Sequence, residues 1–75
     1  MIPVINNTET GLNIRRLMEE HHLSTRDIQK ICGLTTVTSI YKWFCGDSIP
    51  SIDNLLILAD AFGCTVEDVL VIHRK

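Results

Sequence analysis

The sequence predicts an all-α fold, a compact five-helix bundle, and three observations support this prediction. Apolar residues recur at helical spacing along most of the 75 residues. Residues that favour helix starts precede these apolar segments, and glycines that favour helix ends follow three of them. The expected helices span about residues 10–21, 24–32, 36–45, 51–62 and 65–73.

Capping residues define the starts of three expected helices. Ser24 is the expected N-cap of the second helix, because its hydroxyl can accept a backbone N–H while Asp27 completes a capping box. Thr65 and Asp68 repeat this pattern at the start of the fifth helix. Ser51 is the expected N-cap of the fourth helix. These starts leave only short connections between the helices.

The first helix has a weaker start signal, and glycines predict the ends of three others. The segment Thr10–Asn13 is a poor match to a capping pattern, so the start of the first helix is less well defined. Gly33, Gly46 and Gly63 each follow an apolar-periodic segment, as glycines in left-handed conformation commonly do. N-cap residues and C-terminal glycines therefore predict where most of the short helices begin and end.

Each expected helix carries one apolar stripe, and together the stripes would form the core. The stripes contain Ile14, Leu17 and Met18; Ile28, Ile31 and Cys32; Ile40 and Trp43, with Phe44 left open; Ile52, Leu55, Leu56, Ala59 and Phe62; and Val66, Val69 and Leu70. Strand-like alternation occurs only at Pro3–Ile5, which is too short to predict a strand. Residues 1–9 are expected to form a flexible arm before one domain of residues 10–75.

Charge is distributed unevenly along the chain. The net charge is −2, which argues mildly against nucleic-acid binding. Residues 43–73 contain five acidic residues and no Lys or Arg. Any phosphate contact must therefore come from the first half of the chain, apart from the terminal Arg74 and Lys75.

Several function classes are not supported by the sequence. The cysteines Cys32, Cys45 and Cys64 are widely spaced, so no metal site is predicted, and reduced thiols in a cytoplasmic protein are expected. No apolar run is long enough to cross a membrane, and the first residues do not form a secretion signal. No catalytic set or phosphate loop is present. We expect no enzyme activity, no cofactor and no small-molecule substrate.

The segment from Leu23 to Gly46 is the most informative one for function. It combines a capped short helix, a glycine, a turn of three or four residues, and a second short helix that ends in glycine. This is the layout of a DNA-binding helix-turn-helix. Ile40 and Trp43 can be buried together on the second of these helices. The residues left facing outward are then Val37, Thr38, Tyr41 and Lys42, and the first turn also carries the small polar residues Thr36 and Ser39.

The sequence resembles the Cro/lambda-repressor-like (Xre-type) helix-turn-helix family over about residues 11–72. The resemblance rests on the segments IRRLMEEHHLS, SIYKWFCG, IPSIDNLLILADAFG and TVEDVL, and on the turn glycine Gly33. It implies a lambda-repressor-like DNA-binding domain of five helices, in which the second and third helices form the DNA-binding unit. Proteins of this kind commonly bind palindromic operators as dimers.

The resemblance also implies which residues contact DNA. The positions implied for bases or the groove are Thr36, Val37, Thr38, Tyr41 and Lys42, and those implied for phosphates are Thr25, Arg26 and Ser48. Two departures from the family pattern affect these positions. The turn is one residue longer, so either Thr35 or Thr36 can be the helix N-cap. Thr25 also replaces the usual glutamine, which shortens the side chain that reaches the phosphate.

Other interpretations remain open for the aromatic and basic residues. Tyr41 can contact the groove or pack at the rim of the domain. Phe44 can contact DNA sugars or a partner subunit, or pack under the following loop. Of Arg15 and Arg16, one can pair with an acid while the other approaches phosphate.

The sequence therefore predicts a transcriptional regulator, expected to be a repressor, that binds a double-stranded DNA operator sequence-specifically as a homodimer. The helix over about residues 36–45 would enter the major groove. The alternative is a protein-interaction module, such as an antitoxin or an accessory subunit that binds a partner protein. The net charge of −2 is the observation that favours this alternative.

Overall fold

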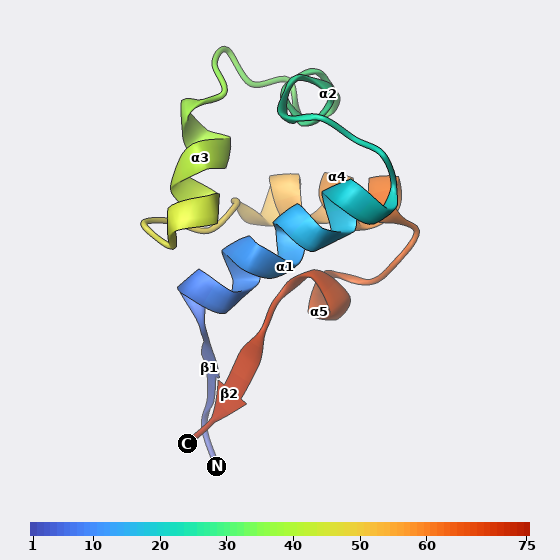
Figure 1. The fold of residues 1–75 in the computed structure, drawn as a ribbon. Coiled ribbons are helices and arrows are strands. Elements are labelled where there is room, and N and C mark those ends of the chain that lie inside the picture. Colours follow the sequence, from blue (N-terminus) through green and yellow to red (C-terminus); the bar gives the residue numbers. More distant parts are fainter.

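The computed structural model describes all of residues 1–75 and contains five helices and a two-stranded sheet. The elements in chain order are β1 (Pro3–Ile5), α1 (Asn7–Glu20), α2 (Thr25–Cys32), α3 (Thr38–Cys45), α4 (Ile52–Phe62), α5 (Val66–Val69) and β2 (Ile72–Arg74). In Figure 1, α2 and α3 lie on one side of α1, and α5 and the strands lie on the other. The five predicted helices are present, but the small sheet makes the term all-α approximate.

The two ends of the chain form an antiparallel ribbon, which the sequence did not predict. Val4 lies opposite His73, so β1 pairs with a strand about 70 residues away. The fifth helix ends at Val69 rather than near residue 73, because the following residues form β2. Residues 1–9, expected to be a flexible arm, contain β1 and the first turn of α1 in the structure.

The predicted start of the first helix was wrong. Asn6 is the N-cap of α1, and its side-chain oxygen accepts the N–H of Glu9 at 2.9 Å. Thr10 therefore lies inside the helix rather than before it. Asn is among the preferred N-cap residues, so Asn6 could have been predicted as the cap. The choice was difficult because residues 6–10 are all polar and several of them are also possible caps.

The predicted N-caps of α2, α4 and α5, which are Ser24, Ser51 and Thr65, are confirmed. The N–H of Asp27 donates to the Ser24 hydroxyl at 3.1 Å, and the N–H of Ser24 donates to the Asp27 carboxylate at 2.8 Å. Thr65 and Asp68 form the same capping box at α5. In both boxes, the N–H groups of the cap residue hold the pKa of the aspartate below its ordinary value of 3.8. The three predicted C-terminal glycines all have left-handed backbones.

One cluster of eleven apolar side chains forms the core: Ile14, Leu17, Met18, Ile28, Ile40, Trp43, Leu55, Leu58, Ala59, Phe62 and Val69. The predictions for Ile31, Ile52 and Leu56 were wrong, because all three are exposed, and buried Leu58 was not predicted. Residues 52–59 of α4 are mostly apolar on every side. Periodicity alone therefore could not determine which stripe of α4 faces the core.

Gly11 allows α1 and α3 to approach each other closely. A Cβ at residue 11 would lie 1.9 Å from the carbonyl oxygen of Trp43 and 3.1 Å from the Cα of Phe44. Any side chain there would collide with the backbone of α3. Gly11 therefore fixes the distance between α3 and the rest of the bundle.

Two polar residues of α1 hold the C-terminal segment in place. The buried Thr10 hydroxyl accepts the N–H of Val71 at 2.9 Å. The side-chain Nδ2 of Asn13 donates to the carbonyl oxygens of Asp68 and Val69 at 2.8 and 2.9 Å. These bonds satisfy backbone groups at the end of α5 and before β2.

Candidate nucleic-acid interface

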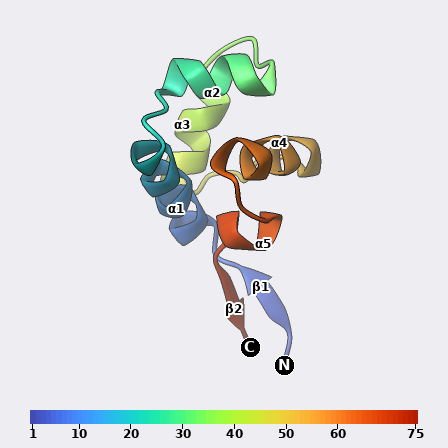
Figure 2. The ribbon, with the colours of Figure 1, turned by 90° about the vertical axis from the view of Figure 1, so that its right-hand side faces the viewer.

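The turn between α2 and α3 is tied to the end of α2. Gly33 ends the helix with φ of +67°, and the N–H of Leu34 donates to the carbonyl of Gln29 at 2.9 Å. The Gln29 side chain also donates to the carbonyl of Thr35 at 3.1 Å. Leu34 packs against the core. The turn therefore holds α3 in a defined position beside α2, as Figures 1 and 2 show.

α3 begins at Thr38, two residues later than the sequence predicted. Its N-cap is Val37, which has helix-like backbone angles and makes no side-chain capping bond. Neither Thr35 nor Thr36 is the N-cap, so both predicted registers differ from the structure. The hydroxyl of Thr36 still accepts the N–H of Thr38, at 3.3 Å. Because α2 ends at Cys32, the extra turn residue lengthens the connection instead of the helix.

α3 has one buried and one exposed face. Ile40 and Trp43 are buried, as the apolar spacing predicted. The five candidate groove residues are Thr36, Thr38, Tyr41 and Lys42, which are exposed, and Val37, which is half-buried. Thr38 and Lys42 are four residues apart and therefore share one side of the helix. These side chains are accessible to a ligand that lies along α3.

The candidate phosphate residues lie at two places. Thr25 and Arg26 form the first turn of α2, where Thr25 is half-buried and Arg26 exposed. Ser48 is half-buried in the loop between α3 and α4. The capping box uses the N–H groups of Ser24 and Asp27, and no hydrogen bond within the protein occupies those of Thr25 and Arg26. These two N–H groups remain available to an anion.

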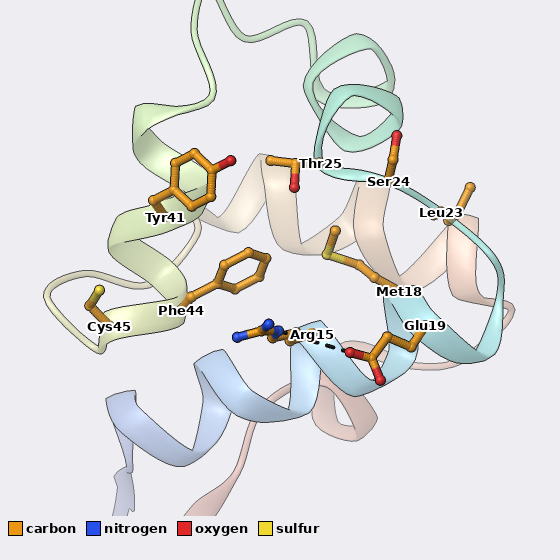
Figure 3. A pocket seen from close by; sticks show the side chains of 9 residues that line it. All are labelled: Arg15, Met18, Glu19, Leu23, Ser24, Thr25, Tyr41, Phe44 and Cys45. Atoms are coloured by element: carbon orange, nitrogen blue, oxygen red, sulfur yellow. Dashed lines mark ion pairs between the residues drawn. The ribbon is translucent and has the colours of Figure 1, made fainter.

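An open groove of about 560 Å³ lies between α1, the start of α2 and α3 (Figure 3). The lining residues are Arg15, Met18, Glu19, Leu23, Ser24, Thr25, Tyr41, Phe44 and Cys45. Thr25 of α2 and Tyr41 of α3 thus border the same groove. One residue predicted to contact phosphate and one predicted to face the major groove therefore border the same groove.

Phe44 forms part of the groove and contacts two of its other residues. Its ring centroid is 6.1 Å from that of Tyr41, in an edge-on arrangement, and 5.7 Å from the guanidinium carbon of Arg15. Arg15 is therefore placed for a cation–π contact with Phe44. No pattern in the sequence indicates this arrangement, because Arg15 comes from α1 whereas Tyr41 and Phe44 come from α3.

Both ion pairs of the protein lie within α1. Arg15 pairs with Glu19 at 3.9 Å, and Arg16 pairs with Glu20, in each case one helical turn apart. All four side chains are exposed, so these pairs add little stability. The expectation from the sequence is that one arginine pairs with an acid and the other approaches phosphate, whereas in the structure both pair with an acid.

The basic residues of α2 and α3 make no ion pair. Arg26, Lys30 and Lys42 are exposed and have no acidic partner within 4 Å. Arg26 and Lys30 are one turn apart on α2 and therefore share a face. The helix-turn-helix unit thus carries free positive charge although the chain as a whole is negative.

The remaining candidate sites have little to support them. No group of three or more His, Cys, Asp or Glu side chains is arranged to hold a metal ion. Burial raises the pKa of the Cys32 and Cys64 thiols, and Cys45 is exposed beside the groove. None of the five helices has both the length and the apolar character needed to span a membrane.

Residues 14–69 match a family model described as helix-turn-helix, which covers most of the chain. The protein belongs to this family. The match confirms the resemblance to Xre-type, lambda-repressor-like domains, which are DNA-binding transcription regulators rather than enzymes.

A solved structure shares the fold of this helix-turn-helix protein. It is the crystal structure of the restriction-modification controller protein C.AhdI from Aeromonas hydrophila, with a TM-score of 0.71 and 22% sequence identity. The match covers 83% of this chain and 92% of the controller protein. A search of curated protein sequences finds no match.

Proposed function

We propose that this protein is a transcriptional repressor that binds a double-stranded DNA operator sequence-specifically, as a homodimer, with α3 in the major groove. The proposal rests on the observation that Thr25 and Tyr41 line the same groove. The start of α2 therefore lies next to the exposed face of α3. A duplex that lies across this surface can contact both helices at once.

The exposed side of α3 has the chemistry for reading bases. Thr38 offers a hydroxyl and a methyl group, and Lys42 can donate hydrogen bonds to O6 and N7 of guanine. Tyr41 lies on the next turn of α3, while Thr36 and Val37 precede the helix and would approach the DNA major groove from the turn. The first two residues of α3, Thr38 and Ser39, have small side chains, so the start of the helix can approach base edges closely.

The start of α2 has the chemistry for holding the phosphate backbone. The free N–H groups of Thr25 and Arg26 and the Arg26 guanidinium can all donate to phosphate oxygens. Ser48, in the loop after α3, supplies a further hydroxyl. These contacts would hold the domain on any duplex, while the residues of α3 would select the sequence.

The test is fluorescence anisotropy on an operator selected from a random duplex pool, at several salt concentrations. Thr38→Ala should weaken binding to the operator by about 1–3 kcal/mol and leave binding to random DNA unchanged. Arg26→Ala should weaken binding to both and reduce the salt slope by about one. Arg16→Ala removes the same charge from α1, outside the groove, and should have little effect.

Two results would overturn the proposal. One is the absence of salt-sensitive binding to any duplex. The other is an equal effect of Thr38→Ala on operator and random DNA, which would mean that α3 does not read the sequence. The acidic residues between 43 and 73 favour the alternative of a protein-interaction module. That alternative would be supported if the protein bound no duplex but formed a complex of fixed stoichiometry with a partner protein.

A further inference from the structure

The ribbon of β1 and β2 extends from the end of the molecule opposite the turn between α2 and α3 (Figures 1 and 2). Its apolar side chains remain exposed, including Ile2, Val4, Ile5 and Ile72. A two-stranded ribbon has two edges, and each edge presents backbone groups that can pair with a further strand. The hydrogen bonds of the ribbon determine which groups these are.

The backbone groups of Ile72 and Arg74 point away from β1. Ile2 and Lys75 bond to each other in both directions, and the N–H of Asn6 donates to Val71. In an antiparallel pair, bonded residue pairs alternate with pairs whose backbone groups face outward. The register therefore makes Val4 and His73 a bonded pair, and it turns Ile72 and Arg74 outward on β2.

The two edges of the ribbon are not equivalent. On β1 the outward-facing residues are Pro3 and Ile5, and Pro3 has no N–H to donate. On β2 the outward-facing residues are Ile72 and Arg74, which offer two N–H and two carbonyl groups. Pro3 thus blocks the β1 edge of the ribbon, while the β2 edge has all of its outward hydrogen-bonding groups.

We propose that the free edge of β2 pairs antiparallel with β2 of a second copy of this chain, so that the two ribbons form one four-stranded sheet. This inference rests on the homodimer of the proposed function and names its interface. Because Pro3 blocks the edge of β1, the sheet cannot extend further, and association ends at two copies.

Hydrogen bonding selects one register for this pair. With the two-fold axis at His73, Ile72 of each copy lies opposite Arg74 of the other, and all eight outward groups are used in four hydrogen bonds. Placing Ile72 opposite Ile72 would pair only half of these groups. Placing Arg74 opposite Arg74 would also set two like charges side by side.

Charge favours the antiparallel direction. This register puts Lys75 of one copy opposite Val71 of the other, two residues after α5, the helix that carries the exposed Glu67 and Asp68. The basic end of each strand thus approaches an acidic segment of the second copy. A parallel pair would instead bring Arg74 and Lys75 of both copies together.

The first test compares two variants by sedimentation equilibrium without DNA. Arg74→Pro and Arg74→Ala both remove the guanidinium, but only Arg74→Pro removes the outward N–H. Neither change affects a bond between β1 and β2. The wild-type protein and Arg74→Ala should approach twice the chain mass of 8.5 kDa as concentration rises. Arg74→Pro should stay at the monomer mass, with an unchanged far-UV circular dichroism spectrum.

The second test locates the axis by disulfide formation in a variant without the three native cysteines. His73→Cys should crosslink two copies under mild oxidation, because facing non-bonded residues have Cα atoms about 4.5 Å apart, within disulfide range. Val4→Cys lies opposite residue 73 in the same ribbon, away from the axis, and should not crosslink.

The interface is refuted if the wild-type protein is monomeric at every concentration, or if Arg74→Pro dimerises as well as Arg74→Ala. It is also refuted if Val4→Cys crosslinks as readily as His73→Cys. Both tests are done without DNA, so they distinguish the two proposals. A protein that forms this dimer but binds no duplex would contradict the proposed function and leave the interface intact.

Discussion

Replacing Gly11 with alanine tests the close approach between α1 and α3. The added Cβ would lie 1.9 Å from the carbonyl oxygen of Trp43, whereas ordinary contacts are 3.4–4 Å. The shortfall is about 1.5 Å, and the obstacle is backbone rather than a mobile side chain. α1 and α3 would therefore have to move apart across the buried core.

The expected change in unfolding free energy of Gly11→Ala follows from two opposing effects. Alanine in a helix interior is favoured over glycine by about 1 kcal/mol. Overpacking costs roughly 1–3 kcal/mol, and the collision of Gly11→Ala with backbone puts it at the upper end of that range. The net loss of unfolding free energy should be about 2 kcal/mol, which lowers Tm by roughly 8–16 °C in a domain of this size.

The assay is thermal and urea unfolding followed by circular dichroism and by the fluorescence of Trp43, the only tryptophan. Leu12→Ala is the control, because residue 12 follows Gly11 in α1 but is half exposed. It should change stability by less than about 0.5 kcal/mol. If Gly11→Ala were as stable as the wild type, or more stable, the close packing of α1 on α3 would be wrong.

Three further predictions concern a buried hydroxyl, a capping carboxylate and a thiol. Thr10→Val should cost about 1–3 kcal/mol in urea unfolding, because it leaves the N–H of Val71 without an acceptor; a neutral effect would mean that water replaces the hydroxyl. The folded-state pKa of Asp27 is depressed, so its contribution is present above pH 3.8 and is lost as pH falls through the folded value. The Tm difference between wild type and Asp27→Asn should therefore shrink from pH 6 to pH 2.5, and a constant difference would contradict this. Cys45 should be alkylated before the other two cysteines, which mass spectrometry of labelled peptides can check.

Local signals were sufficient to predict much of the fold. The capping boxes at Ser24 and Thr65, and the glycines that end α2, α3 and α4, depend on residues within four positions of each other. Such patterns are contained in short segments of sequence, so the helices they delimit could be predicted. The same is true of the helix-turn-helix, whose elements follow each other directly in the chain.

Most of the features that were missed depend on contacts between distant segments. β1 has only three residues, and nothing in their sequence indicates that Ile72–Arg74 will pair with them. Leu58 is buried and Leu56 exposed only because of where α2 and α5 lie against α4. The groove could not be predicted for the same reason, since Arg15 and Phe44 meet only through the packing of α1 on α3.

One miss was local. The start of α3 was misplaced because Val37 ends the turn without a side-chain cap.

The bonds from Thr10 and Asn13 to the residues after Asp68 have a consequence for how the domain folds. They join residues separated by more than 50 positions, whereas the capping boxes join residues three apart. Contacts of such long range close large loops and form late in folding. The helix-turn-helix can therefore form first, from local contacts. We expect the ribbon to join the two ends of the chain in a final step and to fray before the helices open.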